Sequence, residues 1–156
     1  MAILEDKENL LWQLGWHQPE DVQKAAMEAI VSDTAFDPAL LLMPVSKACW
    51  ENAAICLKRI GYPRSIQVLD GMLEWLKDLN WPGADVILSL LESYPKEAFR
   101  RGYEKAVERA VKDKDEDWLG GLFHFVAKQK VLREDFSDPG LYDALVRHRE
   151  KITGNR

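Results

Sequence analysis

Three acidic residues in the middle of the chain, Asp70, Glu74 and Asp78, repeat at a spacing of four. Residues four apart share one face of a helix, so these carboxylates are expected to form a ridge. Like charges at this spacing repel by roughly 0.2–0.5 kcal/mol per pair, a cost that a cationic partner offsets. The pattern predicts an acidic binding ridge. The alternative is a solvated face that Arg or Lys from a neighbouring helix neutralises.

The ridge is poorly suited to metal binding or acid–base catalysis. Its outer carboxylates would lie roughly 12 Å apart, at about 1.5 Å of rise per residue, too far to share an ion without other ligands. The three histidines, His17, His124 and His148, are scattered along the chain. There is no glycine-rich phosphate loop and no HExxH motif. We therefore expect no catalytic residue, no metal and no cofactor.

Two tryptophans flank the end of the ridge. Trp75 falls at the edge of the apolar arc of the same predicted helix, which favours a place in the core. Trp81 lies at a Trp-Pro corner, where it either packs or anchors a partner, because Trp is favoured at the energetic centres of interfaces. The predicted binding residues are Asp70, Glu74, Asp78 and Trp81.

The composition is that of an ordinary soluble globular protein, with 47% hydrophobic and 30% charged residues in 156. This length suits a single domain over residues 1–156, with a frayed tail from about residue 152. The formal net charge is −5. Residues 1–45 carry eight acids and two lysines, so the N-terminal third is the acidic part. This balance disfavours nucleic acid as a partner.

The two cysteines, Cys49 and Cys56, are seven residues apart in a helical pattern. Their Cα atoms would then be roughly 10 Å apart, beyond the about 7 Å that a disulfide allows. We expect free, buried thiols, which fits a reducing cytoplasm. The acidic N-terminus does not resemble a signal peptide, and no apolar run is long enough to cross a membrane.

Apolar residues recur at helical spacing along almost the whole chain, and no segment alternates as a strand does. The pattern predicts about eight helices, which span residues 3–14, 19–31, 46–60 and 63–79 and then begin near residues 82, 95, 118 and 139. In the first of these, Leu4, Leu11 and Leu14 share one face. The second carries Glu20, Asp21 and Glu28, which would extend the acidic ridge if both helices line one groove.

Three helix connections share one order of residues: aliphatic, then Gly or Asn, then aromatic, then Pro. They centre on Gly15, Gly61 and Asn80. Gly or Asn favours the left-handed conformation that ends a helix, and Pro favours the first turn of the next one. In the seventh helix, Gly120 and Gly121 permit close packing or a kink.

Such stiff corners predict an all-α fold in which antiparallel pairs, helices one–two through seven–eight, stack as a short HEAT-like superhelix. The sixth predicted helix carries opposite charges four residues apart, which we expect to neutralise each other. The pair lengths are uneven, so a compact irregular helical bundle is the alternative architecture.

Residues 73–84, LEWLKDLNWPGA, resemble the signature of a bacterial family, the domain of unknown function 5071. The segment ENAAICLKRIGYP at 51–63 also fits that family's pattern, and the resemblance covers roughly residues 48–93. It implies a small, all-helical, bacterial and cytoplasmic protein with no known activity or cofactor. The helix pairs are similar in organisation to armadillo and HEAT repeats.

These features favour a protein-interaction module, of adaptor or immunity type, whose acidic groove covers a basic patch on another protein. We expect neither nucleic acid nor membrane as a partner, and the sequence does not define the oligomeric state. One alternative is an enzyme or small-ligand binder with a pocket at the Trp-Pro corner, built from Trp81 with Asp78 or Glu74. Another is a structural homodimer that uses exposed apolar surface of the second or eighth helix.

Overall fold

The structure of the protein is a computed structural model that describes residues 2–129 and 131–154, with side chains at 6–129 and 131–151. Within these residues the chain forms eight α-helices and no strand, which confirms the expected all-α class. The α-helices are α1 (Ala2–Trp12), α2 (Glu20–Ser32), α3 (Trp50–Ile60), α4 (Leu69–Trp75), α5 (Ala84–Glu92), α6 (Lys96–Lys112), α7 (Glu116–Gln129) and α8 (Pro139–Gly154). Short 3₁₀ helices are η1 (Pro38–Leu41), η2 (Lys47–Cys49), η3 (Arg64–Val68) and η4 (Arg133–Asp135).

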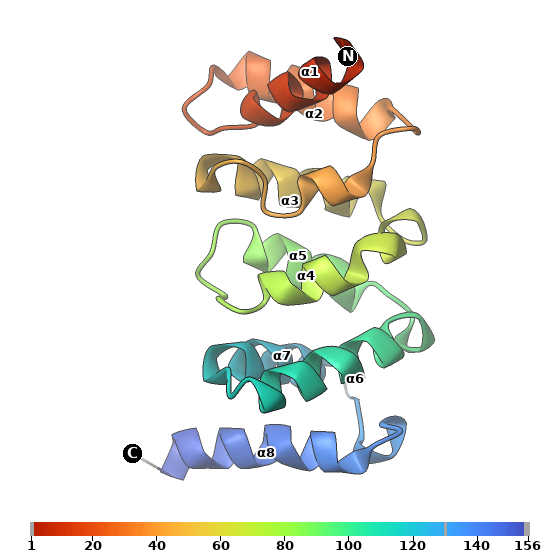
Figure 1. Ribbon diagram of the computed structural model, residues 1–156, viewed down its shortest axis with the longest axis vertical. Helices are drawn as coiled ribbons and strands as arrows, with labels where there is room; N and C mark the ends of the chain where they lie inside the picture. The colour runs from red at the N-terminus through yellow and green to blue at the C-terminus, as the bar shows by residue number, and fades with distance from the viewer. Residues whose placement is uncertain (1, 130, 155–156) are drawn as a thin grey trace.

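The helices stack in layers along the long axis, from α1 and α2 at one end to α8 at the other (Figure 1). A rear row runs through α2, α3, α5 and α7, each of which contacts the next. A front row contains α4 and α6, which contact each other, and α8 contacts both α6 and α7. Clefts lie between successive layers, one between α2 and α3 and another between α4 and α6.

The layers differ from the expected pairing of helices three–four, five–six and seven–eight. Helix α4 shares its layer with α5, and α6 shares its layer with α7 (Figure 1). The reason is η1, which packs against α3 and takes the front position of that layer. A HEAT-like superhelical arrangement of these layers stays a prediction.

The predicted fourth helix, over residues 63–79, is much shorter than its pattern indicated. The chain runs through η3 before α4 begins at Leu69, and α4 ends at Trp75. Leu76 follows as its C-cap and is fully buried. Because the chain turns away there, Asp78 lies beyond the helix and does not share a face with Asp70.

The left-handed positions at the three corners also differ from the expected ones. Gly61 has the expected positive φ, 68°, but its ψ of −176° lies outside the left-handed helical conformation. The other glycine at positive φ among the described residues is Gly83, which adopts that conformation with a φ of 86° and a ψ of −12°. Gly15 and Asn80 are not at positive φ. The Asn80 backbone N–H instead donates to the Asp78 carboxylate at 2.8 Å.

Three tryptophans pack together at the Trp-Pro corner. The Trp50 ring meets the Trp75 ring edge to face, at 6.1 Å between centroids, and the Trp81 ring at 5.6 Å. The Trp75 indole N–H donates to the carbonyl of Pro82 at 3.0 Å, and the side chain is fully buried, which confirms its predicted place in the core. The Gly83 backbone N–H donates to the Glu51 carboxylate at 2.7 Å.

Replacing Gly83 by alanine is expected to lower the free energy of unfolding by about 2–3 kcal/mol. Its φ disfavours a side chain, and a Cβ there would lie 2.8 Å from the Trp50 carbonyl oxygen and 2.9 Å from the Trp75 ring. Urea unfolding measures the loss. Gly61→Ala is the matched control, since its Cβ would meet only the Lys58 carbonyl oxygen, at 3.5 Å. Equal losses in both variants would contradict the packing argument.

Other expectations concern the cysteines and the chain ends. Cys49 and Cys56 are free and buried, as predicted, and burial raises the pKa of the Cys56 thiol to about 12. Helix α8 continues through Gly154, while residues 155–156 of the expected tail and the Leu4 side chain lie outside the described residues. None of the described helices has the length and apolar character that a membrane crossing requires.

Candidate functional site

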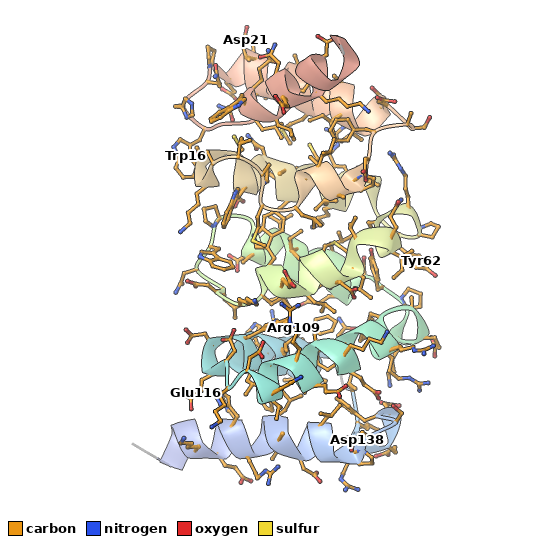
Figure 2. The ribbon with its side chains drawn as sticks, in the orientation of Figure 1. Trp16, Asp21, Tyr62, Arg109, Glu116 and Asp138 are labelled. Carbon is orange, nitrogen blue, oxygen red and sulfur yellow. The ribbon has the colours of Figure 1, made fainter. Side chains whose placement is uncertain are left out.

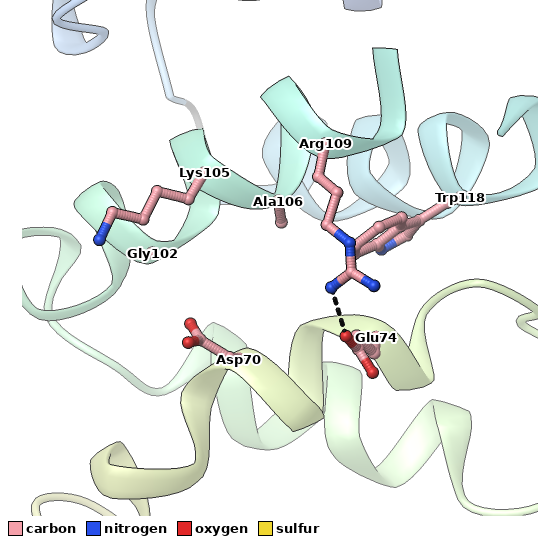
Figure 3. A pocket seen from close by; sticks show the side chains of 7 residues that line it. All are labelled: Asp70, Glu74, Gly102, Lys105, Ala106, Arg109 and Trp118. Carbon is pink, nitrogen blue, oxygen red and sulfur yellow. Dashed lines mark hydrogen bonds and ion pairs between the residues drawn. The ribbon is translucent and has the colours of Figure 1, made fainter. Parts of the chain in front are cut away.

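Two of the predicted ridge residues line a cleft between α4 and α6 on the front of the molecule (Figure 3). Asp70 and Glu74 come from α4, while Lys105 and Arg109 come from α6. The cleft has a volume of about 190 Å³, and its lining is completed by Gly102, Ala106 and Trp118.

Glu74 is paired across this cleft. An Nη atom of Arg109 lies 2.7 Å from the Glu74 carboxylate, and the Arg109 Nε lies 3.9 Å from Asp113. The side chains of Glu74 and Arg109 are 34% and 56% exposed, so solvent screens the pair and its contribution to stability is about 0–1 kcal/mol. Neutralisation by a neighbouring helix, the alternative to an open acidic ridge, is therefore what occurs at Glu74.

Trp118 forms the inner wall of the cleft. Its indole N–H donates to the Leu73 carbonyl at 2.9 Å, near the end of α4, and the side chain is 1% exposed. The Lys77 ammonium lies 4.6 Å from the ring centroid, and the Arg109 guanidinium carbon lies 5.6 Å from it. The face of the ring thus contacts two cations beside the paired Glu74.

Asp70 and Lys105 stand on opposite sides of the cleft (Figure 3). Both residues are exposed, and neither has a hydrogen bond or ion pair within the described part of the chain. Gly102 lies one turn before Lys105 on α6, and a Cβ at Gly102 would come 2.8 Å from the Leu69 side chain. The cleft therefore carries two carboxylates and two cations and is balanced in formal charge, unlike the acidic groove that the sequence predicted.

Asp78 and Trp81, the other predicted binding residues, lie elsewhere. Asp78 lines a separate cleft of about 420 Å³, together with Lys77, Glu116 and His148. Trp81 does not line this cleft. Trp81 is half-buried and packs on Trp50. The structure brings Asp70 and Glu74 together and separates both of them from the remaining two residues.

The acidic residues of α2 do not extend the ridge, because α2 belongs to the rear row. Glu20 and Glu28 line a cleft of about 590 Å³ between α2 and α3. Lys24 lies 3.1 Å from Glu20, and Arg59 lies 2.6 Å from Glu28, so both carboxylates are paired. Asp21 is exposed near the end of the stack (Figure 2).

The sequence interpretation missed Lys105, Arg109 and Trp118 as parts of the site. It treated the charges of the sixth helix as neutralised within that helix. A usable signal exists in the sequence, since Gly102, Lys105 and Arg109 recur at spacings of three and four and so share one face of a helix. A small residue beside two cations on one face indicates close contact with an acidic neighbour.

The fold and the cleft define a class of protein: a small, layered all-helical protein with charged clefts between its layers. Within the described residues, no group of three or more His, Cys, Asp or Glu side chains is placed to hold a metal ion. Residues 44–153 match the model of the family described as domain of unknown function (DUF5071), and the chain belongs to that family. Searches of the curated proteins and of the solved structures gave no match.

Proposed function

We propose that the protein is a protein-interaction module that receives a segment of its partner in the cleft between α4 and α6. The observation that supports this proposal best is the exposed pair of Asp70 and Lys105, which face each other across the cleft without partners of their own (Figure 3). A cationic side chain of the partner pairs with Asp70, and an acidic or carbonyl group of the partner accepts hydrogen bonds from Lys105.

The finer proposal is that of a small bacterial adaptor or immunity-type protein of the cytoplasm, with a basic partner. The net charge of −5 supports a basic partner, because opposite net charges speed the encounter of two proteins. The Glu74–Arg109 pair fixes one end of the cleft. The partner's charges therefore meet Asp70 first.

The proposal predicts that Asp70→Lys abolishes capture of the partner from host lysate at low salt. The four charged positions of the cleft would then hold three cations and one carboxylate, and the three cations would repel a basic segment. Quantitative mass spectrometry of the captured proteins measures this, with the wild type at low and high salt alongside. A partner that binds through the cleft is retained by the wild type at low salt and lost at high salt.

Glu108→Lys is the matched control, because Glu108 is an exposed acid on α6 outside this cleft. It changes the net charge by the same amount and is expected to leave capture within about twofold of the wild type. Equal capture by the wild type and Asp70→Lys would contradict binding at this cleft. Equal loss in both charge variants would show that net charge alone, rather than the cleft, selects the partner.

A further inference from the structure

We infer that the turn between α1 and α2 is a second docking surface, which binds an arginine-bearing segment of a partner protein. Its main feature is a pair of exposed tryptophans. Trp12 is 47% exposed and Trp16 is 60% exposed, whereas the other four tryptophans of the chain are buried or half-buried. An indole ring in water is unfavourable, and tryptophan is favoured at interface centres.

The turn is held in place by hydrogen bonds. The Trp16 backbone N–H donates to the Ala48 carbonyl at 3.1 Å. The Gln23 side-chain amide donates to the carbonyl of Gln18 at 2.7 Å, and the Asn52 amide donates to that of Leu14 at 2.8 Å. A surface fixed in this way loses little conformational entropy on binding, which favours a binding role.

Exposed acidic side chains lie close in sequence to both tryptophans. Glu8 lies four residues before Trp12 on α1 and so shares its face of the helix. Glu20 and Asp21 open α2 directly after the turn, and all three acids are exposed. Figure 2 shows Trp16 and Asp21 at the same end of the stack.

The lysines of this region are turned toward other groups. Lys24 pairs with Glu20. Lys7 lies over the ring of Phe36 at 5.9 Å from its centroid, and Lys47 lies over the ring of Trp50 at 5.7 Å. Glu8 and Asp21, in contrast to Glu20, have no ion pair among the described residues, so these two acids favour a cationic partner.

The adjoining cleft between α2 and α3 gives room for the rest of the segment. It has a volume of about 590 Å³ and contains the apolar side chains of Met27 and Ile55. Gln23 and Asn52, which line this cleft, also bind the α1–α2 turn, so cleft and turn form one continuous surface. An aliphatic residue beside the arginine would fill the apolar part.

Arginine is the cation that fits best, because its planar guanidinium stacks on an indole face while its N–H groups reach carboxylates. Lysine provides the charge without the planar stacking surface. Both tryptophans precede residue 44, where the family match begins. The α1–α2 turn is also separate from the cleft of Asp70, which lies between α4 and α6. Each of the two proposals is therefore tested by its own variant.

The test is a fluorescence-anisotropy titration with labelled oligo-arginine and oligo-lysine of equal length. We expect the wild type to bind oligo-arginine more tightly than oligo-lysine, and the variant Trp12→Ala/Trp16→Ala to weaken oligo-arginine binding about tenfold and abolish the preference. Circular dichroism confirms that the variant is folded. Equal affinity of the wild type for both peptides would overturn the inference.

Tyr62→Ala provides the matched aromatic control. Tyr62 is 46% exposed, close to Trp12 in exposure, but it lies at the opposite edge of the molecule from Trp16 (Figure 2). Tyr62→Ala is expected to leave both affinities within about twofold of those of the wild type. Unchanged oligo-arginine binding in the double tryptophan variant would overturn the inference. So would a wild-type dimer in sedimentation equilibrium that this variant dissociates, since the occupant would then be a second copy.

Discussion

Replacing Gly121 by alanine is expected to lower the free energy of unfolding by about 3 kcal/mol or more. A Cβ at this position would lie 2.0 Å from the Leu76 carbonyl oxygen and 3.1 Å from the carbonyl carbon. These are backbone atoms, which cannot rotate away as a side chain can. Helix α7 would have to move from the end of α4, and the hydrogen bond from Trp118 to Leu73 lies one turn away on the same helix.

The neighbouring glycine provides the control. At Gly120 the nearest atom to an added Cβ is the His148 Nε2, at 3.9 Å, which is an ordinary contact. Alanine is favoured over glycine inside a helix by about 1 kcal/mol, so Gly120→Ala is expected to be neutral or stabilising. Urea unfolding of both variants measures the difference. Similar free energies for the two would show that α7 does not pack on α4 as closely as described.

The local patterns of the sequence were sufficient for several features of the fold. Apolar periodicity predicted about eight helices, and the apolar arc placed Trp75 in the core. The close packing predicted for the glycine pair is confirmed at Gly121. Each of these depends on residues within one or two turns of each other, for which propensity and periodicity are informative.

The end of α4 was not predictable in this way, because distant residues determine it. The local pattern continues as a helix through Leu79, yet the chain leaves the helix after Trp75. The groups that meet its last carbonyls are the indole of Trp118 and the bare backbone of Gly121, more than 40 residues along the chain. Tertiary contact therefore overrode helix propensity, and the predicted ridge lost Asp78.

In the candidate site, too, the local sequence predicted some residues, while others are brought in by distant parts of the chain. Asp70 and Glu74 were found from their spacing, but their neighbour Arg109 lies 35 residues beyond Glu74. The predicted fold also paired helices three and four. Since α4 instead faces α6, the cations that balance the cleft come from a helix that was expected to neutralise itself.

Trp118→Ala is the second change with a large expected effect, a loss of about 3–5 kcal/mol in the free energy of unfolding. The indole is 1% exposed, so its removal leaves a cavity between α4 and α7. Trp118→Phe keeps most of the ring and loses the donor to Leu73. That carbonyl also accepts the Leu76 backbone N–H at 3.1 Å, so the expected loss is about 1–2 kcal/mol. Urea unfolding separates the two, and Trp16→Ala, an equal truncation at an exposed site, should cost less than about 0.5 kcal/mol.

Trp118 also matters for the cleft, because the same side chain belongs to the core and lines the candidate site. Lys77 and Arg109 both lie over its ring, and Arg109 reaches Glu74 from there. Trp118→Phe retains an aromatic face for both cations, so it should keep partner capture while losing stability. If Trp118→Phe abolishes capture in a folded protein, the indole N–H holds the end of α4 in the conformation that presents Asp70, and the cleft depends on that one hydrogen bond.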